Sequence, residues 1–79
     1  MNIKVLGPGC VNCTNLEERV KEAVNQLDMD ASIEKVTDYA IMMQYGMMGS
    51  PGLVINNKLV SSGKVLSVKQ VIELIRKSE

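Results

Sequence analysis

Two cysteines close the stretch Ile3-Lys4-Val5-Leu6-Gly7-Pro8-Gly9-Cys10-Val11-Asn12-Cys13, and the chain has no others. The stretch begins with a short apolar segment, Ile3 to Leu6, which the glycines and the proline end with turn chemistry. From Cys13 onward, apolar side chains recur at helical spacing. The two thiols therefore lie where a buried strand meets an amphipathic helix, and this junction suits a reactive, reversible dithiol.

The start of that helix has two interpretations. A capping box of Thr14 and Glu17 leaves the dithiol in the preceding loop, whereas a cap at Gly9 or Cys10 puts it in the first turn. We favour the second, because Cys13 then continues the apolar stripe inward while Cys10 stays at the exposed end. The helix is expected to end near Asp28, and its stripe consists of Cys13, Leu16, Val20, Ala23, Val24 and Leu27.

A strand and a short helix are expected next. Residues Ala31 to Val36 alternate poorly and include charged side chains, as a partly solvated edge strand does. Thr37 or Asp38 is a suitable cap for a helix over Tyr39 to Tyr45, which Gly46 ends.

The remaining residues predict a hairpin followed by a helix. Leu53 to Ile55 and Lys58 to Ser62 are short strands, joined by Asn56-Asn57, which tolerate the positive backbone angles of a tight turn. Ser67 and Gln70 form a capping box. The apolar face of this last helix comprises Val68, Val71, Ile72 and Ile75.

The predicted order of elements is βαβαββα, within one domain covering residues 1–79. A strand–helix–strand unit pairs its strands in parallel with a right-handed crossover, while the closing hairpin is antiparallel. The fold class is therefore α/β, with a mixed four-stranded sheet flanked by helices. The dithiol is expected at the carboxyl end of the first strand, where open α/β sheets place their sites.

Composition excludes several classes of function. Nine basic and nine acidic residues give zero formal charge, so no electrostatic footprint for nucleic acid or an anionic membrane exists. Two tyrosines without Phe or Trp offer little for base stacking. No apolar run approaches a membrane span, and the first one breaks at Gly7, too early for a signal peptide. We therefore expect a cytoplasmic protein, where a close cysteine pair is more often catalytic or metal-binding than structural.

The spacing of the two thiols suits disulfide exchange. A helix N-terminus stabilises a thiolate, so we expect Cys10 to be the acidified, exposed nucleophile. Residues at positions i and i+3 of a helix lie about 5–6 Å apart, which matches the usual Cα separation of a disulfide. Cys10 is predicted to attack a partner disulfide, and Cys13 to resolve the mixed disulfide. This chemistry requires no cofactor beyond the Cys10–Cys13 disulfide.

Ser50-Pro51 is the second candidate for a functional site. A proline before an apolar strand has a plain structural interpretation, because its missing N–H is not needed there. Beside a dithiol, however, a cis peptide bond would aim the Ser50 backbone at the space above Cys10. An extended partner segment would then pair with that backbone like an added strand.

These motifs resemble the thioredoxin-like superfamily, and in particular small prokaryotic thioredoxin–glutaredoxin-like proteins, also called redox-active disulfide proteins. The matching residues are Gly7 to Cys13, Ser50 to Leu53, and Gly63 after the fourth strand. The resemblance covers essentially the whole chain. It implies a thioredoxin fold, Cys10 as nucleophile, Cys13 as resolving thiol and Pro51 as cis-proline. The chain departs from the family in having Val11-Asn12 between the thiols and no acidic residue in the first strand.

On these grounds we predict a monomeric thiol–disulfide oxidoreductase that exchanges electrons with protein disulfides and with a disulfide reductase. The alternative is soft-metal handling, because small metallochaperones also carry two cysteines after their first strand. Those domains run βαββαβ and end on a strand, whereas this chain is predicted to end on a capped helix. Two thiols without histidine also cannot complete a four-ligand zinc site. A redox-controlled binding module without turnover is a third possibility.

Four methionines surround the short second helix. We expect Met42, Met43, Met47 and Met48 to fill the core as flexible side chains. A second hypothesis is that Met47 and Met48 border the dithiol as an adaptable apolar rim for partners.

Overall fold

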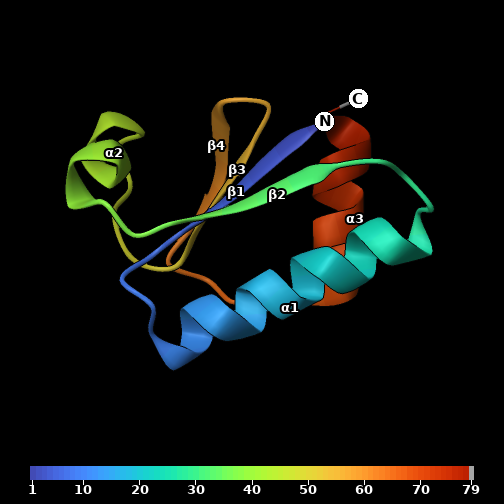
Figure 1. Ribbon diagram of the computed structural model, residues 1–79, viewed down its shortest axis with the longest axis horizontal. Helices are drawn as coiled ribbons and strands as arrows, with labels where there is room; N and C mark the ends of the chain where they lie inside the picture. The colour runs from blue at the N-terminus through green and yellow to red at the C-terminus, as the bar shows by residue number, and fades with distance from the viewer. Residues whose placement is uncertain (79) are drawn as a thin grey trace.

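The computed structural model describes residues 1–78, and its elements follow the predicted βαβαββα order (Figure 1). The strands are β1 (Asn2–Leu6), β2 (Ser32–Val36), β3 (Gly52–Ile55) and β4 (Lys58–Ser62). The helices are α1 (Val11–Gln26), α2 (Tyr39–Gln44) and α3 (Val68–Lys77). The predicted α/β fold class is thus confirmed.

The four strands form one mixed sheet in the order β2-β1-β3-β4. β1 pairs in parallel with β2 and antiparallel with β3, and β3 pairs antiparallel with β4. In the β1–β3 pair, Leu6 lies opposite Gly52. The carboxyl end of β1 and the amino end of β3 therefore lie side by side at one end of the sheet, which brings the cysteine motif and Ser50-Pro51 together.

Helices cover the two faces of the sheet unequally. α1 and α3 lie on one face, while the short α2 lies on the other, near the end of the sheet where β1 stops (Figure 1). Alternate residues of β1 serve the two layers: Ile3 and Val5 belong to the larger core cluster with α1 and α3, and Leu6 belongs to the smaller cluster with Met42. Because side chains at the end of β1 are buried on both faces of the sheet, the point at which the cysteine motif begins is held in place.

Local chemistry explains where the elements start and turn. Asp38 caps α2 by accepting a hydrogen bond from the Ala40 N–H at 2.8 Å, and Ser67 and Gln70 form the predicted capping box of α3. The hairpin turn has positive φ angles at both Asn56 (51°) and Asn57 (68°), as the sequence predicts. None of the helices within residues 1–78 combines the length and apolarity needed to cross a membrane.

The expectation that all four methionines fill the core is wrong for two of them. Met42 is buried, but Met43 is 75% exposed and Met48 is 94% exposed. The reason is the brevity of α2: a helix of six residues presents only one narrow face to the sheet. Met43 points away from that face, and Met48 lies in the loop that follows.

Candidate active site

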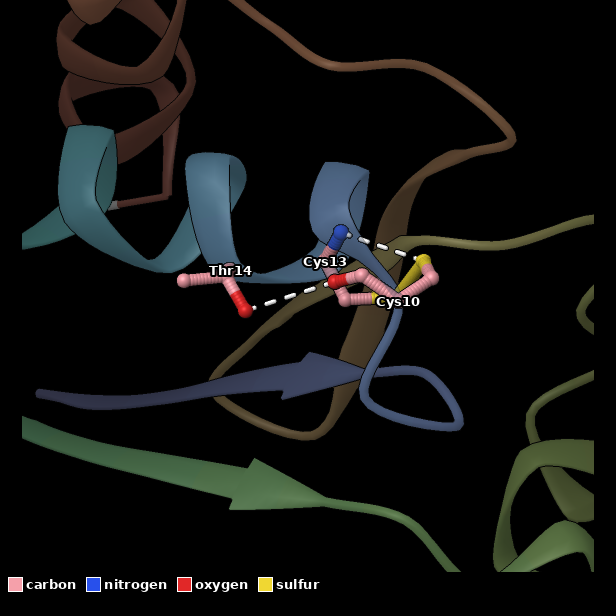
Figure 2. Close-up of a disulfide and its surroundings, with 3 residues drawn as sticks. All are labelled: Cys10, Cys13 and Thr14. Atoms are coloured by element: carbon pink, nitrogen blue, oxygen red, sulfur yellow. Dashed lines mark hydrogen bonds between the residues drawn. A yellow bond between two sulfur atoms is a disulfide. The ribbon is translucent and has the colours of Figure 1, made fainter.

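The cysteine motif forms the first turn of α1. Cys10 is the N-cap, with extended backbone angles, and its sulfur accepts a hydrogen bond from the Cys13 N–H at 3.2 Å. Its carbonyl accepts a hydrogen bond from the Thr14 N–H at 3.0 Å. It also accepts one from the Thr14 hydroxyl at 3.3 Å, which Figure 2 shows. Of the two predicted helix starts, the cap at Cys10 is therefore correct, and Thr14 lies inside the helix.

Cys10 and Cys13 are joined by a disulfide (Figure 2). Their Cα atoms lie 5.1 Å apart, as expected for residues one helical turn apart. The two sulfur-bearing residues differ in access, because Cys13 is buried at 1% exposure whereas Cys10 is partly exposed. Opening or closing the bond requires little backbone movement, and only one side of the pair faces solvent.

Gly7 makes room for the buried cysteine. It follows β1 directly, and its N–H donates to the Val36 carbonyl at 2.9 Å, which anchors it to the end of β2. A Cβ atom at this position would collide with the Cys13 sulfur and would lie 3.9 Å from the Pro51 Cα. The Gly7 backbone thus packs against both the dithiol and the proline. The sequence pattern assigned this glycine only to a turn and missed its contact with Cys13.

We expect Gly7→Ala to destabilise the oxidised protein, because the new methyl group must displace a sulfur that the disulfide holds in place. Overpacking of this kind costs about 1–3 kcal/mol in the free energy of unfolding. Urea denaturation of the oxidised protein measures this loss. Gly49→Ala is the matched control, since a Cβ there meets the Gly63 Cα at an ordinary 3.5 Å. Equal stability of the two variants would contradict the tight contact between Gly7 and Cys13.

Ser50-Pro51 lies at the same end of the sheet as the dithiol, just before β3. The peptide bond between the two residues is cis, the geometry that the resemblance implies for Pro51. Pro51 is buried, and its carbonyl accepts a hydrogen bond from the Gly63 N–H at 2.9 Å. Ser50 is exposed. The structure therefore places an exposed residue, Ser50, next to a buried cis-proline.

An apolar groove adjoins this site. Its volume is about 200 Å³, and its lining includes residues from the loop before Cys10, from α2 and from the loop before Pro51: Pro8, Tyr39, Met42, Met43, Met47, Met48, Gly49 and Ser50. Three of these side chains, those of Tyr39, Met43 and Met48, are largely exposed. Met47 and Met48, the predicted border of the dithiol, line a groove that reaches Pro8 and Ser50, and neither cysteine is among its lining residues.

The core around the site is apolar. Within residues 1–78 no charged or polar side chain is buried, so no acid lies in the core beneath Cys13. The same residues contain no cluster of three or more His, Cys, Asp or Glu side chains able to hold a metal ion. The chain also ends its described elements on α3, a helix, unlike the strand-terminated metallochaperones. This βαβαββα order differs from the βαββαβ order of those domains and so does not favour metal handling.

A disulfide at a helix N-terminus, with one cysteine partly exposed and the other buried near a cis-proline, defines a thiol–disulfide oxidoreductase. Comparison with known families specifies this class further. The chain belongs to the thioredoxin domain family, whose pattern matches residues 1–76.

Individual relatives agree with this assignment. A thioredoxin of Methanothermobacter thermautotrophicus is 33% identical over 75 residues, which cover 95% of this chain and 97% of the relative. A thioredoxin of Methanocaldococcus jannaschii is 35% identical over 74 residues, which cover 94% of this chain and 85% of the relative. A solved structure described as that of a malarial protein is 16% identical and has the same fold, with a TM-score of 0.70 over 96% of this chain and 93% of that one.

Proposed function

We propose that this protein reduces disulfide bonds in other proteins, with Cys10 as the attacking nucleophile and Cys13 as the resolving thiol. The observation that carries the proposal is the Cys10–Cys13 disulfide at the first turn of α1, with Cys10 alone partly exposed. The chemistry uses no group other than the two sulfurs. Electrons come from a disulfide reductase, and the protein works as a monomer in the reducing environment of the cytoplasm.

The exchange proceeds in two balanced steps. The Cys10 thiolate attacks one sulfur of the substrate disulfide, which forms a bond to that sulfur and releases the other as a thiolate. Cys13 then loses its proton and attacks the Cys10 sulfur, which closes the intramolecular disulfide and releases the second substrate thiolate. Two electrons pass to the substrate, its two thiolates take up protons, and the reductase later reverses the process on this chain.

The backbone of α1 favours the first step. The Cys13 N–H already points at the Cys10 sulfur at 3.2 Å, and a hydrogen bond to a thiolate is stronger than one to a neutral sulfur. The positive end of the helix dipole adds to this stabilisation. Because the described core contains no acid, we propose that the proton of Cys13 leaves to solvent or to the departing substrate thiolate.

Ser50 and Pro51 are proposed to bind the substrate. An extended substrate segment would pair with the backbone of the exposed residue Ser50, as a strand adds to a sheet edge, with its disulfide next to Cys10. The adjoining groove would then receive an apolar side chain that neighbours the substrate cysteine. Methionine suits such a surface, because its flexible thioether adapts to different side chains.

The proposal is tested by reduction of insulin disulfides with dithiothreitol as electron source, followed as precipitation of the freed chains. We expect catalysis by the wild-type protein. In parallel, Cu(I) or Cd(II) is titrated into the reduced protein and followed by thiolate absorbance. Tight, stoichiometric metal uptake by the monomer without insulin reduction would contradict the proposal and favour metal handling.

Met48→Ala is expected to slow insulin reduction about three- to tenfold, because it removes apolar contact area from the groove at a position that is 94% exposed. The rate constant for the reaction of the reduced protein with insulin measures the effect. Met29→Ala is the control, since Met29 lies between α1 and β2, away from the groove. An unchanged rate constant in Met48→Ala would show that the rim takes no part in binding.

A further inference from the structure

The Ser62 hydroxyl, at the end of β4, holds the loop that leads to Pro51. It accepts hydrogen bonds from the Met48 N–H at 3.0 Å and from the Gly49 N–H at 3.2 Å. It also donates a hydrogen bond to the Gly49 carbonyl at 3.3 Å. A serine hydroxyl has one proton to donate and two lone pairs, so Ser62 uses its full capacity on two consecutive residues of one loop.

The position of Ser62 follows from strand pairing. Ser62 lies opposite Gly52 in the β3–β4 register, and a register shift occurs between Leu53 and Val54. The next residue, Gly63, donates its N–H to the Pro51 carbonyl at 2.9 Å. The end of β4 thus holds the loop at two points, through the Ser62 side chain before the cis-proline and through the Gly63 backbone at the proline itself.

The loop has few other means of staying in place. Met47 packs on the smaller core cluster, but the Met48 side chain is 94% exposed and gives the backbone no packing support. Gly49 has no side chain to pack at all. Ordering a loop backbone without such support is entropically costly, so the hydrogen bonds of Ser62 decide how often residues 48–50 adopt the observed conformation. All three of these residues line the groove, and they include Ser50, the proposed contact for the substrate backbone.

We propose that Ser62 is a positioning residue that sets the preference of the dithiol for protein disulfides over small ones. A protein substrate needs the Ser50 backbone and the groove wall in place before its disulfide meets Cys10, whereas a small disulfide needs only the exposed sulfur. Ser62 touches neither sulfur, and it acts through the loop alone. This inference rests on the proposed function of the Ser50–Pro51 segment as the place where substrates bind.

The test compares two substrates in stopped flow with the prereduced protein: insulin, and the small disulfide 5,5′-dithiobis(2-nitrobenzoic acid). Loss of the hydrogen bonds in Ser62→Ala is expected to lower the rate constant for insulin about tenfold, and to leave that for the small disulfide within about twofold. Ser62→Thr keeps the hydroxyl and should react with insulin at the wild-type rate. Ser61→Ala is the matched control, because Ser61 takes no part in the hydrogen bonds that hold residues 48 and 49.

A second measurement needs no substrate. Amide hydrogen exchange at Met48 and Gly49 should accelerate in Ser62→Ala and stay at the wild-type rate in Ser61→Ala. Unchanged exchange, or equal slowing with both disulfides, would overturn the positioning role. A wild-type protein that reduces the small disulfide but not insulin would contradict the proposed function instead, while the exchange rates would still decide whether Ser62 orders the loop.

Discussion

Replacing Cys10 by serine is expected to abolish insulin reduction, with a loss on the order of a thousandfold or more. The hydroxyl of serine remains protonated at neutral pH and is a poor nucleophile toward sulfur, and Cys13, at 1% exposure, cannot reach a substrate in its place. The rate of insulin reduction measures the loss. Far-ultraviolet circular dichroism confirms that the variant is folded.

The order of alkylation is an independent measure of the same asymmetry. Reduced wild-type protein treated briefly with iodoacetamide at neutral pH should carry the label on Cys10, located by peptide mass spectrometry, because this thiol is both accessible and stabilised as a thiolate by the helix terminus. Labelling of Cys13 first would reverse the two assignments.

Replacing Cys13 by serine is expected to stop turnover in a different way. The Cys10 thiolate still attacks the substrate, but no thiol lies within reach to release the mixed disulfide, so the covalent complex accumulates. With insulin, the product is a stable adduct of higher mass that dithiothreitol dissociates. Non-reducing electrophoresis and intact mass measure it, and Cys10→Ser serves as the control that forms no adduct.

The same variant identifies natural substrates when it is used as bait in a cell extract, because each trapped protein carries its cysteine in a bond to Cys10. Trapping by Cys10→Ser in place of Cys13→Ser would mean that the buried sulfur is the nucleophile, against the observed exposure of the two residues.

Much of the fold follows from short-range chemistry that is visible in the sequence. The capping box of Ser67 and Gln70, the Asn56-Asn57 turn and the helical stripe from Cys13 each depend on neighbours a few residues away. The order of elements then restricts the topology, because a strand–helix–strand unit with a closing hairpin has few ways to build one sheet. For the same reason the meeting of the dithiol with Ser50-Pro51 was predictable.

The features that the sequence did not reveal depend on contacts between distant residues. The tight packing of Gly7 on Cys13 and Pro51 arises only when β1, α1 and β3 converge, and a glycine beside a proline otherwise indicates a turn. The role of Ser62 depends on the shifted β3–β4 register, which places its hydroxyl within hydrogen-bond distance of the Met48 and Gly49 backbone. The exposure of Met43 and Met48 reflects how little of the sheet α2 covers, which apolar composition alone does not show.

The burial of Cys13 against Gly7 has a consequence for how the protein meets its partners. Since its sulfur is buried next to Gly7, the proposed electron donor and the proposed electron acceptor must both react at Cys10. In the proposed cycle the two partners therefore react at one sulfur in turn, which corresponds to ping-pong order. Because both must contact the same partly exposed residue, the proposed donor and acceptor compete for the Cys10 sulfur.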